Sequence, residues 1–159
     1  MIFRWSFWGT HLANNAELLK CSVLTFKQHF GNGHDYVVCT DNTNIVEEIV
    51  GGIASVIDFN QGGKSIYDIE SKATWKKWCP KVRLDINKTE IYIDSDVFLL
   101  KFPSEIEQLI ADPKIKFAIM DEFCGQPWQH GAMKNKITDS TPFVNCILRA
   151  NKSTYSAAK

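Results

Sequence analysis

Short runs with the residue pattern of β-strands alternate with segments of helical periodicity along this chain. Residues 2–8 alternate in character, with Phe3, Trp5 and Phe7 on one face, and residues 19–30 carry apolar side chains at helical spacing. Strands that alternate with helices are joined by crossover connections, which bring the strands side by side and parallel. We therefore predict an α/β domain with three layers (α/β/α) around a mostly parallel sheet.

The later elements follow the same alternation. Capping residues predict helix starts at Asn14, Asn44 and Ser65, and Pro103 is placed at the first position of a fourth helix. Further strands are expected at residues 36–39, 54–59, 91–93, 117–120 and 142–148. Residues 121–141 lack either pattern and are expected to form a long loop, which is often functional.

The size and charge of the chain narrow its possible functions. Its 159 residues suit a single domain covering 1–159, and 45% hydrophobic residues are enough for a proper core. Lysine plus arginine and aspartate plus glutamate each number 18, so the formal net charge is zero and predicts no nucleic-acid partner. No apolar run approaches the roughly 20 residues that cross a bilayer, so no membrane span is expected.

The cysteines and the first residues of the chain indicate the cellular compartment in which the protein is expected. The five cysteines are widely spaced and contain no Cys-x-x-Cys pair, which argues against a zinc site. Several lie in apolar runs, where free cysteine is an ordinary core residue. The opening residues lack the basic and then apolar plan of a signal peptide. A reducing cytoplasm is the expected location.

The most specific chemical feature is Asp94-Ser95-Asp96, which follows the apolar run Ile91-Tyr92-Ile93. In an extended chain, alternate residues point to the same side, so the two carboxylates are expected to converge. Two close carboxylates repel each other, and a divalent cation removes that cost. Oxygen ligands favour Mg²⁺, Mn²⁺ or Ca²⁺, and open coordination positions suit a diphosphate. The apolar pattern resumes at residues 97–100 and is interpreted as a continued strand.

Acidic residues also follow other predicted strands. Asp41 and Asp121 end their strands as Asp94 does, and ligands of α/β sheets lie beyond the carboxyl ends of the strands. A polar pocket is therefore expected at this edge of the sheet. Asp121 and Glu122 are candidates to face an acceptor sugar or orient its hydroxyl, and Trp128, in the long loop, is a candidate to stack on a sugar ring.

The run IYIDSDV at residues 91–97 resembles the Asp-x-Asp segment of glycosyltransferases with the A-type fold, in particular the glycogenin-like and bacterial enzymes of family 8. Residues 24–29 resemble the end of that family's opening strand and helix. A basic segment, residues 81–84, precedes the acidic motif as in those enzymes, and Asn145 stands where they carry an Asn-x-Gly segment.

The resemblance implies a metal-dependent transfer of a sugar from a nucleotide-diphosphate donor, with UDP expected, to a saccharide or other hydroxyl acceptor. It assigns Asp94 to the donor ribose and the metal, and Asp96 to the metal, Mn²⁺ or Mg²⁺. Thr10, after the first strand, is the candidate contact to the base. Lys81 and Arg83 are candidates to neutralise the diphosphate, while the other lysines of residues 72–88 are expected on a solvated face.

The sequence also departs from the family. Asn145 is not followed by the expected glycine, and the later His-x-x-Gly-x-x-Lys segment, which supplies a third metal ligand, is missing. The sequence stops where family members continue, as a shortened form would. A second hypothesis is therefore an inactive or truncated nucleotide-binding domain of the same fold. The catalytic residue and the stereochemical course stay open.

Two other classes of enzyme fit less well. Haloacid-dehalogenase-type phosphatases also place Asp-x-Asp after a strand, but their motif has Thr or Val where Phe98 stands, and it lies near the chain start. A metal-dependent nucleotidyltransferase stays possible, although no glycine-rich loop follows the first predicted strand.

Overall fold

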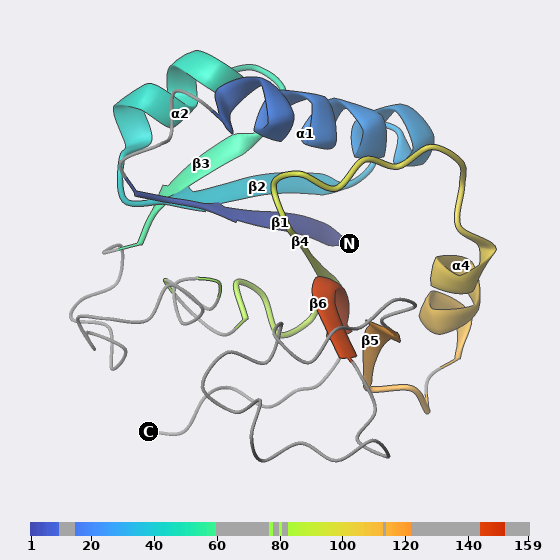
Figure 1. The fold of residues 1–159 in the computed structure, drawn as a ribbon. Coiled ribbons are helices and arrows are strands. Elements are labelled where there is room, and N and C mark those ends of the chain that lie inside the picture. Colours follow the sequence, from blue (N-terminus) through green and yellow to red (C-terminus); the bar gives the residue numbers. More distant parts are fainter. Residues whose placement is uncertain are drawn as a thin grey trace, which may run out of the picture.

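A six-stranded sheet with helices packed against it is the framework of the described part of the chain (Figure 1). The computed structural model describes residues 1–9, 15–59, 77, 80, 83–112, 114–121 and 144–151. Its elements are β1 (Ile2–Phe7), α1 (Ala16–Phe30), β2 (Asp35–Thr40), α2 (Thr43–Val50), β3 (Ser55–Asp58), β4 (Glu90–Ile93), α4 (Ser104–Ala111), β5 (Phe117–Asp121) and β6 (Val144–Asn151).

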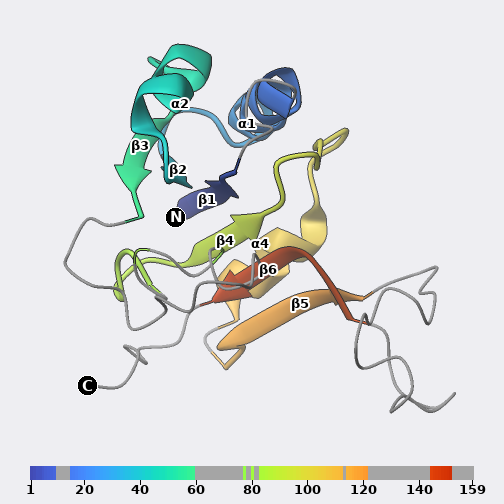
Figure 2. The ribbon, with the colours of Figure 1, turned by 60° about the vertical axis from the view of Figure 1, so that its left-hand side comes forward.

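The strand order is β3-β2-β1-β4-β6-β5, with β1 near the middle (Figure 2). Strands β3, β2, β1 and β4 are paired in parallel, whereas β6 runs antiparallel to both of its neighbours. Helices connect β1 to β2 and β2 to β3, as parallel neighbours require. The predicted α/β class and mostly parallel sheet are confirmed.

The main core lies between one face of the sheet and the helices. Phe3, Trp5 and Phe7 of β1 are buried on this face, as their spacing predicts. Helices α1, α2 and α4 all contribute to the same cluster, through Leu19, Val23, Phe26, Val46, Val50, Ile106 and Leu109. These helices form one layer of the expected three. The helix predicted from Ser65 lies outside the described residues.

The helix starts differ by a residue or two from the prediction. Asn15, rather than Asn14, precedes α1, and its side chain makes no capping hydrogen bond; Asn14 lies outside the described residues. Helix α2 is capped by Asn42, whose side chain accepts a hydrogen bond from the Ile45 amide, so the cap expected at Asn44 is wrong. Asn42 follows β2 almost directly, and the chain therefore enters the helix earlier.

The predicted strand at residues 97–100 is not formed. The Val97 amide donates to the Asp94 carbonyl at 3.2 Å, which makes a tight turn directly after β4. Beyond this turn the chain runs across α1 towards α4 (Figure 1), with Leu100 88% exposed. The apolar run reflects packing against a helix on one side, rather than a place in the sheet.

Hydroxyl groups of α1 hold this crossing segment. The Trp5 indole donates to the Ser22 hydroxyl at 2.9 Å, and that hydroxyl donates to the Val97 carbonyl at 2.5 Å. Thr25 accepts a hydrogen bond from the Leu99 amide at 3.1 Å. The buried Ser22 therefore links the core of the sheet to the turn after β4.

We expect Ser22→Ala to lower the free energy of unfolding by about 1–3 kcal/mol, because the indole of Trp5 and the carbonyl of Val97 both lose their partner. Urea denaturation measures the change. Ser55→Ala, at an exposed serine, is the control and should have little effect. Equal stability of the two variants would contradict the linking role.

Candidate functional site

The carboxyl ends of β1, β2 and β4 meet at one edge of the sheet. The Gly9 amide, after β1, donates to the Asp41 carboxylate, after β2, at 3.4 Å. The Ser6 hydroxyl donates to the Lys77 carbonyl at 3.4 Å, which places Lys77 at the same edge. Asp94 follows β4 directly, so polar groups gather at this edge as predicted, and the pocket expected there stays a prediction.

The acidic motif forms a turn, not an extended strand. The hydrogen bond from the Val97 amide to the Asp94 carbonyl encloses Ser95 and Asp96 in this turn. Asp94 is half-buried and Asp96 is exposed. The prediction that strand alternation aligns the two carboxylates is therefore wrong, because strand geometry ends at Ile93. Turn geometry fixes their relative position.

Lys77 forms an ion pair with Asp94. Its ammonium nitrogen lies 2.5 Å from Asp94 Oδ1, and the two side chains are 22% and 27% exposed. An ammonium thus occupies one of the two predicted metal ligands. Sequence analysis missed this contact, because Lys77 lies in a basic stretch that reads as a solvated face. The only sign of this contact in the sequence is the adjacent pair Lys76 and Lys77 ahead of β4.

The donor set at the turn suits a hard divalent cation. Asp94 and Asp96 offer carboxylate oxygens, the ligands that Mg²⁺ and Mn²⁺ prefer, although Lys77 already pairs with one oxygen of Asp94. Within the part of the chain that the structure describes, no three histidine, cysteine, aspartate or glutamate side chains gather as a metal cluster. The described protein ligands would be these two acids.

Arg83 is not brought to the acidic turn. Its guanidinium is buried at the amino end of β4, where it donates to the carbonyls of Asp85 and Lys88 and lies 3.4 Å from Glu90. Strand β4 separates this position from Asp94 by about 13 Å, four residues at about 3.3 Å each. The structure therefore places Arg83 away from the acidic turn, and its contact with a diphosphate stays a prediction.

Burial beside the same network raises the pKa of Tyr92, although the charges of Arg4 and Arg83 act against the rise. Glu90 lies 3.5 Å from Arg4, and the Arg4 guanidinium lies 5.2 Å from the centre of the Tyr92 ring. Burial, and then the charge of Glu90, raise the pKa of Tyr92 to about 12. These charged groups belong to the sheet face opposite the helices.

The other predicted site residues lie outside the described residues. Thr10 and Lys81, the candidate contacts to the base and diphosphate, are among them, as are Glu122 and Trp128. Asp121 ends β5, as predicted from the strand pattern. The described site therefore consists of the acidic turn, Lys77 and the ends of β1 and β2.

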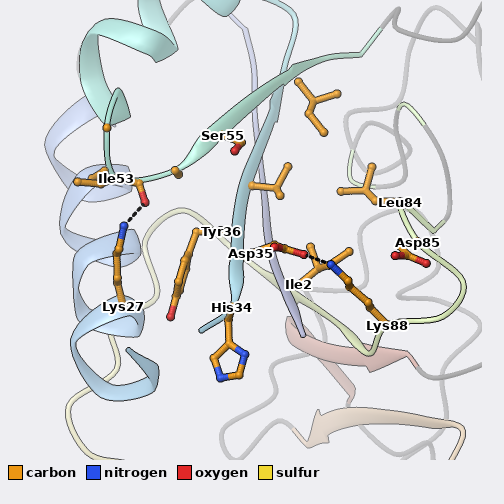
Figure 3. Close-up of a pocket in the computed structure, with 14 residues that line it drawn as sticks. Ile2, Lys27, His34, Asp35, Tyr36, Ile53, Ser55, Leu84, Asp85 and Lys88 are labelled. Atoms are coloured by element: carbon orange, nitrogen blue, oxygen red, sulfur yellow. Dashed lines mark hydrogen bonds and ion pairs between the residues drawn. The ribbon is translucent and has the colours of Figure 1, made fainter. Parts of the chain in front are cut away.

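A cavity of about 590 Å³ lies at the opposite edge of the sheet, at the amino ends of the strands (Figure 3). Lys88 and Asp35 form an ion pair of 2.6 Å on its wall, and Lys27 donates to the Ile53 carbonyl at 3.0 Å. The hydrogen bond and charge of Asp35 raise the pKa of Lys88. This cavity is distinct from the acidic turn, since it opens at the other end of the sheet.

The fold is similar to that of the galactosyltransferase LgtC. A structure of LgtC in complex with donor and acceptor sugar analogues matches with a TM-score of 0.58 and 12% identity, over 96% of this chain and 58% of that chain. A structure of an active-site mutant of LgtC matches with a TM-score of 0.55 and 13% identity, over 96% and 57%. This chain thus spans a little over half the length of these structures, and the likeness concerns the fold.

Comparisons by sequence give no further relative. No protein-family profile matches the chain, and no curated protein matches it. Among the described residues, no helix has the length and apolar character that crossing a membrane requires.

We expect Arg83→Met to lower the free energy of unfolding by about 3 kcal/mol, because it leaves the buried Glu90 with one fewer cation. Chemical denaturation measures the loss. The control, Lys88→Met, breaks a water-exposed ion pair and should cost much less. A stable Arg83→Met protein with weakened UDP binding would contradict the structural role and support the predicted contact with the diphosphate.

The buried Tyr92 predicts a loss of stability in alkali. Its pKa is about 12 in the folded chain and 10.0 ordinarily, so the unfolded chain loses this proton first. The contribution of protonated Tyr92 to the free energy of unfolding is complete below about pH 10. It falls by about 1 kcal/mol per pH unit as the pH rises to about 12. Urea denaturation at pH 9 and pH 11 should show a steeper loss in the natural chain than in Tyr92→Phe. Equal losses would disprove the shift.

Proposed function

We propose that this chain binds a nucleotide-diphosphate sugar at the carboxyl edge of its sheet and transfers the sugar to a hydroxyl acceptor. The observation that carries the proposal is the Asp94-Ser95-Asp96 turn at the end of β4, in a fold similar to that of LgtC. LgtC was crystallised with donor and acceptor sugar analogues. A UDP-sugar is the donor that the sequence resemblance favours, and a saccharide is the proposed acceptor.

Mn²⁺ or Mg²⁺ is the proposed cofactor, held by Asp96 and Asp94. When bound, such a cation supplies Lewis-acid stabilisation of the negative charge on a departing diphosphate. Asp96 is exposed and therefore accessible to a cation with its water shell, whereas Asp94 is held at the strand end beside Lys77. The two acids bind and orient the donor at the edge where α/β sheets receive ligands.

The proposed location is the cytoplasm. Cys21 is a free, exposed thiol. Free thiols are usual in a reducing compartment.

A nucleotide-binding domain without transferase activity is the second candidate. The ion pair between Lys77 and Asp94 favours it, because the ammonium occupies an oxygen that a metal would need. Donor binding without sugar transfer or donor hydrolysis would support this candidate over the first.

The test is binding of UDP with and without Mn²⁺, measured by isothermal titration calorimetry, followed by assays of transfer and hydrolysis with UDP-sugars. We expect Asp96→Asn to weaken Mn²⁺-dependent UDP binding more than about tenfold, since even outer-shell partners of metals are worth about 10- to 100-fold. Binding without Mn²⁺ should change little.

Asp35→Asn is the matched control, because Asp35 is an exposed aspartate at the opposite edge of the sheet. Its binding of UDP and Mn²⁺ should equal that of the natural chain. Thermal unfolding of both variants checks that they are folded. Unchanged Mn²⁺-dependent binding in Asp96→Asn would refute the metal site, and failure of the natural chain to bind UDP under either condition would refute both candidates.

A further inference from the structure

The ion pairs Lys77–Asp94 and Lys88–Asp35 differ in their exposure to water. Their nitrogen–oxygen distances are nearly equal, 2.5 Å and 2.6 Å, but the side chains are 22% and 27% exposed in the first pair and 46% and 48% in the second. Water and salt screen a half-buried pair less than an exposed one. The pair at the acidic turn is therefore the stronger of the two.

Residues of β1 and β4 position both partners of the stronger pair. Asp94 directly follows β4, and the Ser6 hydroxyl of β1 bonds to the Lys77 carbonyl. Strands β1 and β4 are adjacent, with Trp5 paired to Ile93 in the register. Strands β1 and β4 thus bring the Lys77 backbone and the Asp94 carboxylate to the same edge, where the Lys77 ammonium reaches Asp94.

We propose that Lys77 is an internal counter-ion that competes with the divalent cation for Asp94. This inference rests on the proposed function, because it concerns the same metal site. An ammonium 2.5 Å from the carboxylate oxygen and a metal ion on the same carboxylate would be two cations within a few ångströms, and they repel each other. Cation binding at Asp94 and Asp96 therefore requires Lys77 to move away.

The competition between Lys77 and the cation also has a consequence for the protein without metal. Two carboxylates on one turn repel each other, and the ammonium offsets part of that repulsion. The same contact lowers the affinity of the turn for Mn²⁺, since the metal must displace it. Lys77 sets the concentration of cation at which the site fills.

The test is the affinity for Mn²⁺ alone, measured by calorimetry or by electron paramagnetic resonance, in the natural chain and in Lys77→Met. We expect the variant to bind Mn²⁺ about two- to fivefold more tightly, the range that corresponds to a solvent-accessible ion pair. Lys77→Gln should behave in the same way, and Lys77→Arg, which keeps the charge, should stay close to the natural chain. Lys88→Met removes the matched lysine at the opposite edge and should leave Mn²⁺ affinity unchanged.

Thermal unfolding gives a second readout that a merely structural lysine would not produce. Mn²⁺ should raise the melting temperature of Lys77→Met more than that of the natural chain, because binding in the variant breaks no ion pair. If Mn²⁺ raises the melting temperature of Lys77→Met no more than that of the natural chain, the proposed competition between Lys77 and the cation is overturned.

The outcomes separate this inference from the proposed function. Equal Mn²⁺ affinity in the natural chain and both neutral variants, with Mn²⁺-dependent UDP binding intact, would overturn the inference alone. Tighter Mn²⁺ binding in the variants without any UDP binding would support the competition and refute the sugar-nucleotide function. Absence of Mn²⁺ binding in all variants would overturn both.

Discussion

The packing of β1 against α1 is the contact on which the rest of the structure depends. Phe3 and Trp5 of this strand are fully buried, and their rings contact Phe26 of the helix. Strand β1 also pairs with β2 on one side and with β4 on the other. Each such side chain contributes about 1.5–3 kcal/mol when buried. The acidic turn is held through the same contact, because Ser22 of α1 joins Trp5 to the Val97 carbonyl.

Charge is distributed differently at the two ends of the sheet. The amino ends of the strands carry a cavity, an exposed ion pair and the buried guanidinium of Arg83, whereas the carboxyl ends carry the Asp94–Asp96 turn with Lys77. The first set satisfies its own charges within the protein. At the second, Lys77 pairs with Asp94 and Asp96 is exposed, so the turn carries one more negative than positive charge among these three residues.

Patterns within one element could be predicted from the sequence. The alternation of Phe3, Trp5 and Phe7 gave the buried face of β1, and Ile91 and Ile93 gave the buried β4. These predictions succeed because burial on a strand depends mainly on residue spacing. The α/β order of the elements was predictable for the same reason.

Features that depend on contacts between distant segments were not predictable. The pairing of Lys77 with Asp94 joins residues on either side of β4 in the sequence. The sequence alone is equally consistent with the Arg83 side chain facing solvent, a ligand or the core. The turn at Asp94 was missed because Val97 and Leu99 are apolar for packing against the main core, whereas Leu100 is exposed. The contributions of Thr10 and Lys81 remain predictions, since both lie outside the described residues.

The antiparallel strand β6 has a consequence for how the chain is made. It covers the side of β4 that β1 leaves open, with Ile93 opposite Leu148. A ribosome releases β4 well before β6, so the unpaired N–H and C=O groups on this side of β4 stay open to a neighbouring nascent chain until residue 151 has emerged. Such an open edge readily recruits foreign strands. Dense polysomes would therefore expose this protein to misassembly at one specific strand, and slow decoding of residues 94–143 would lengthen the exposure.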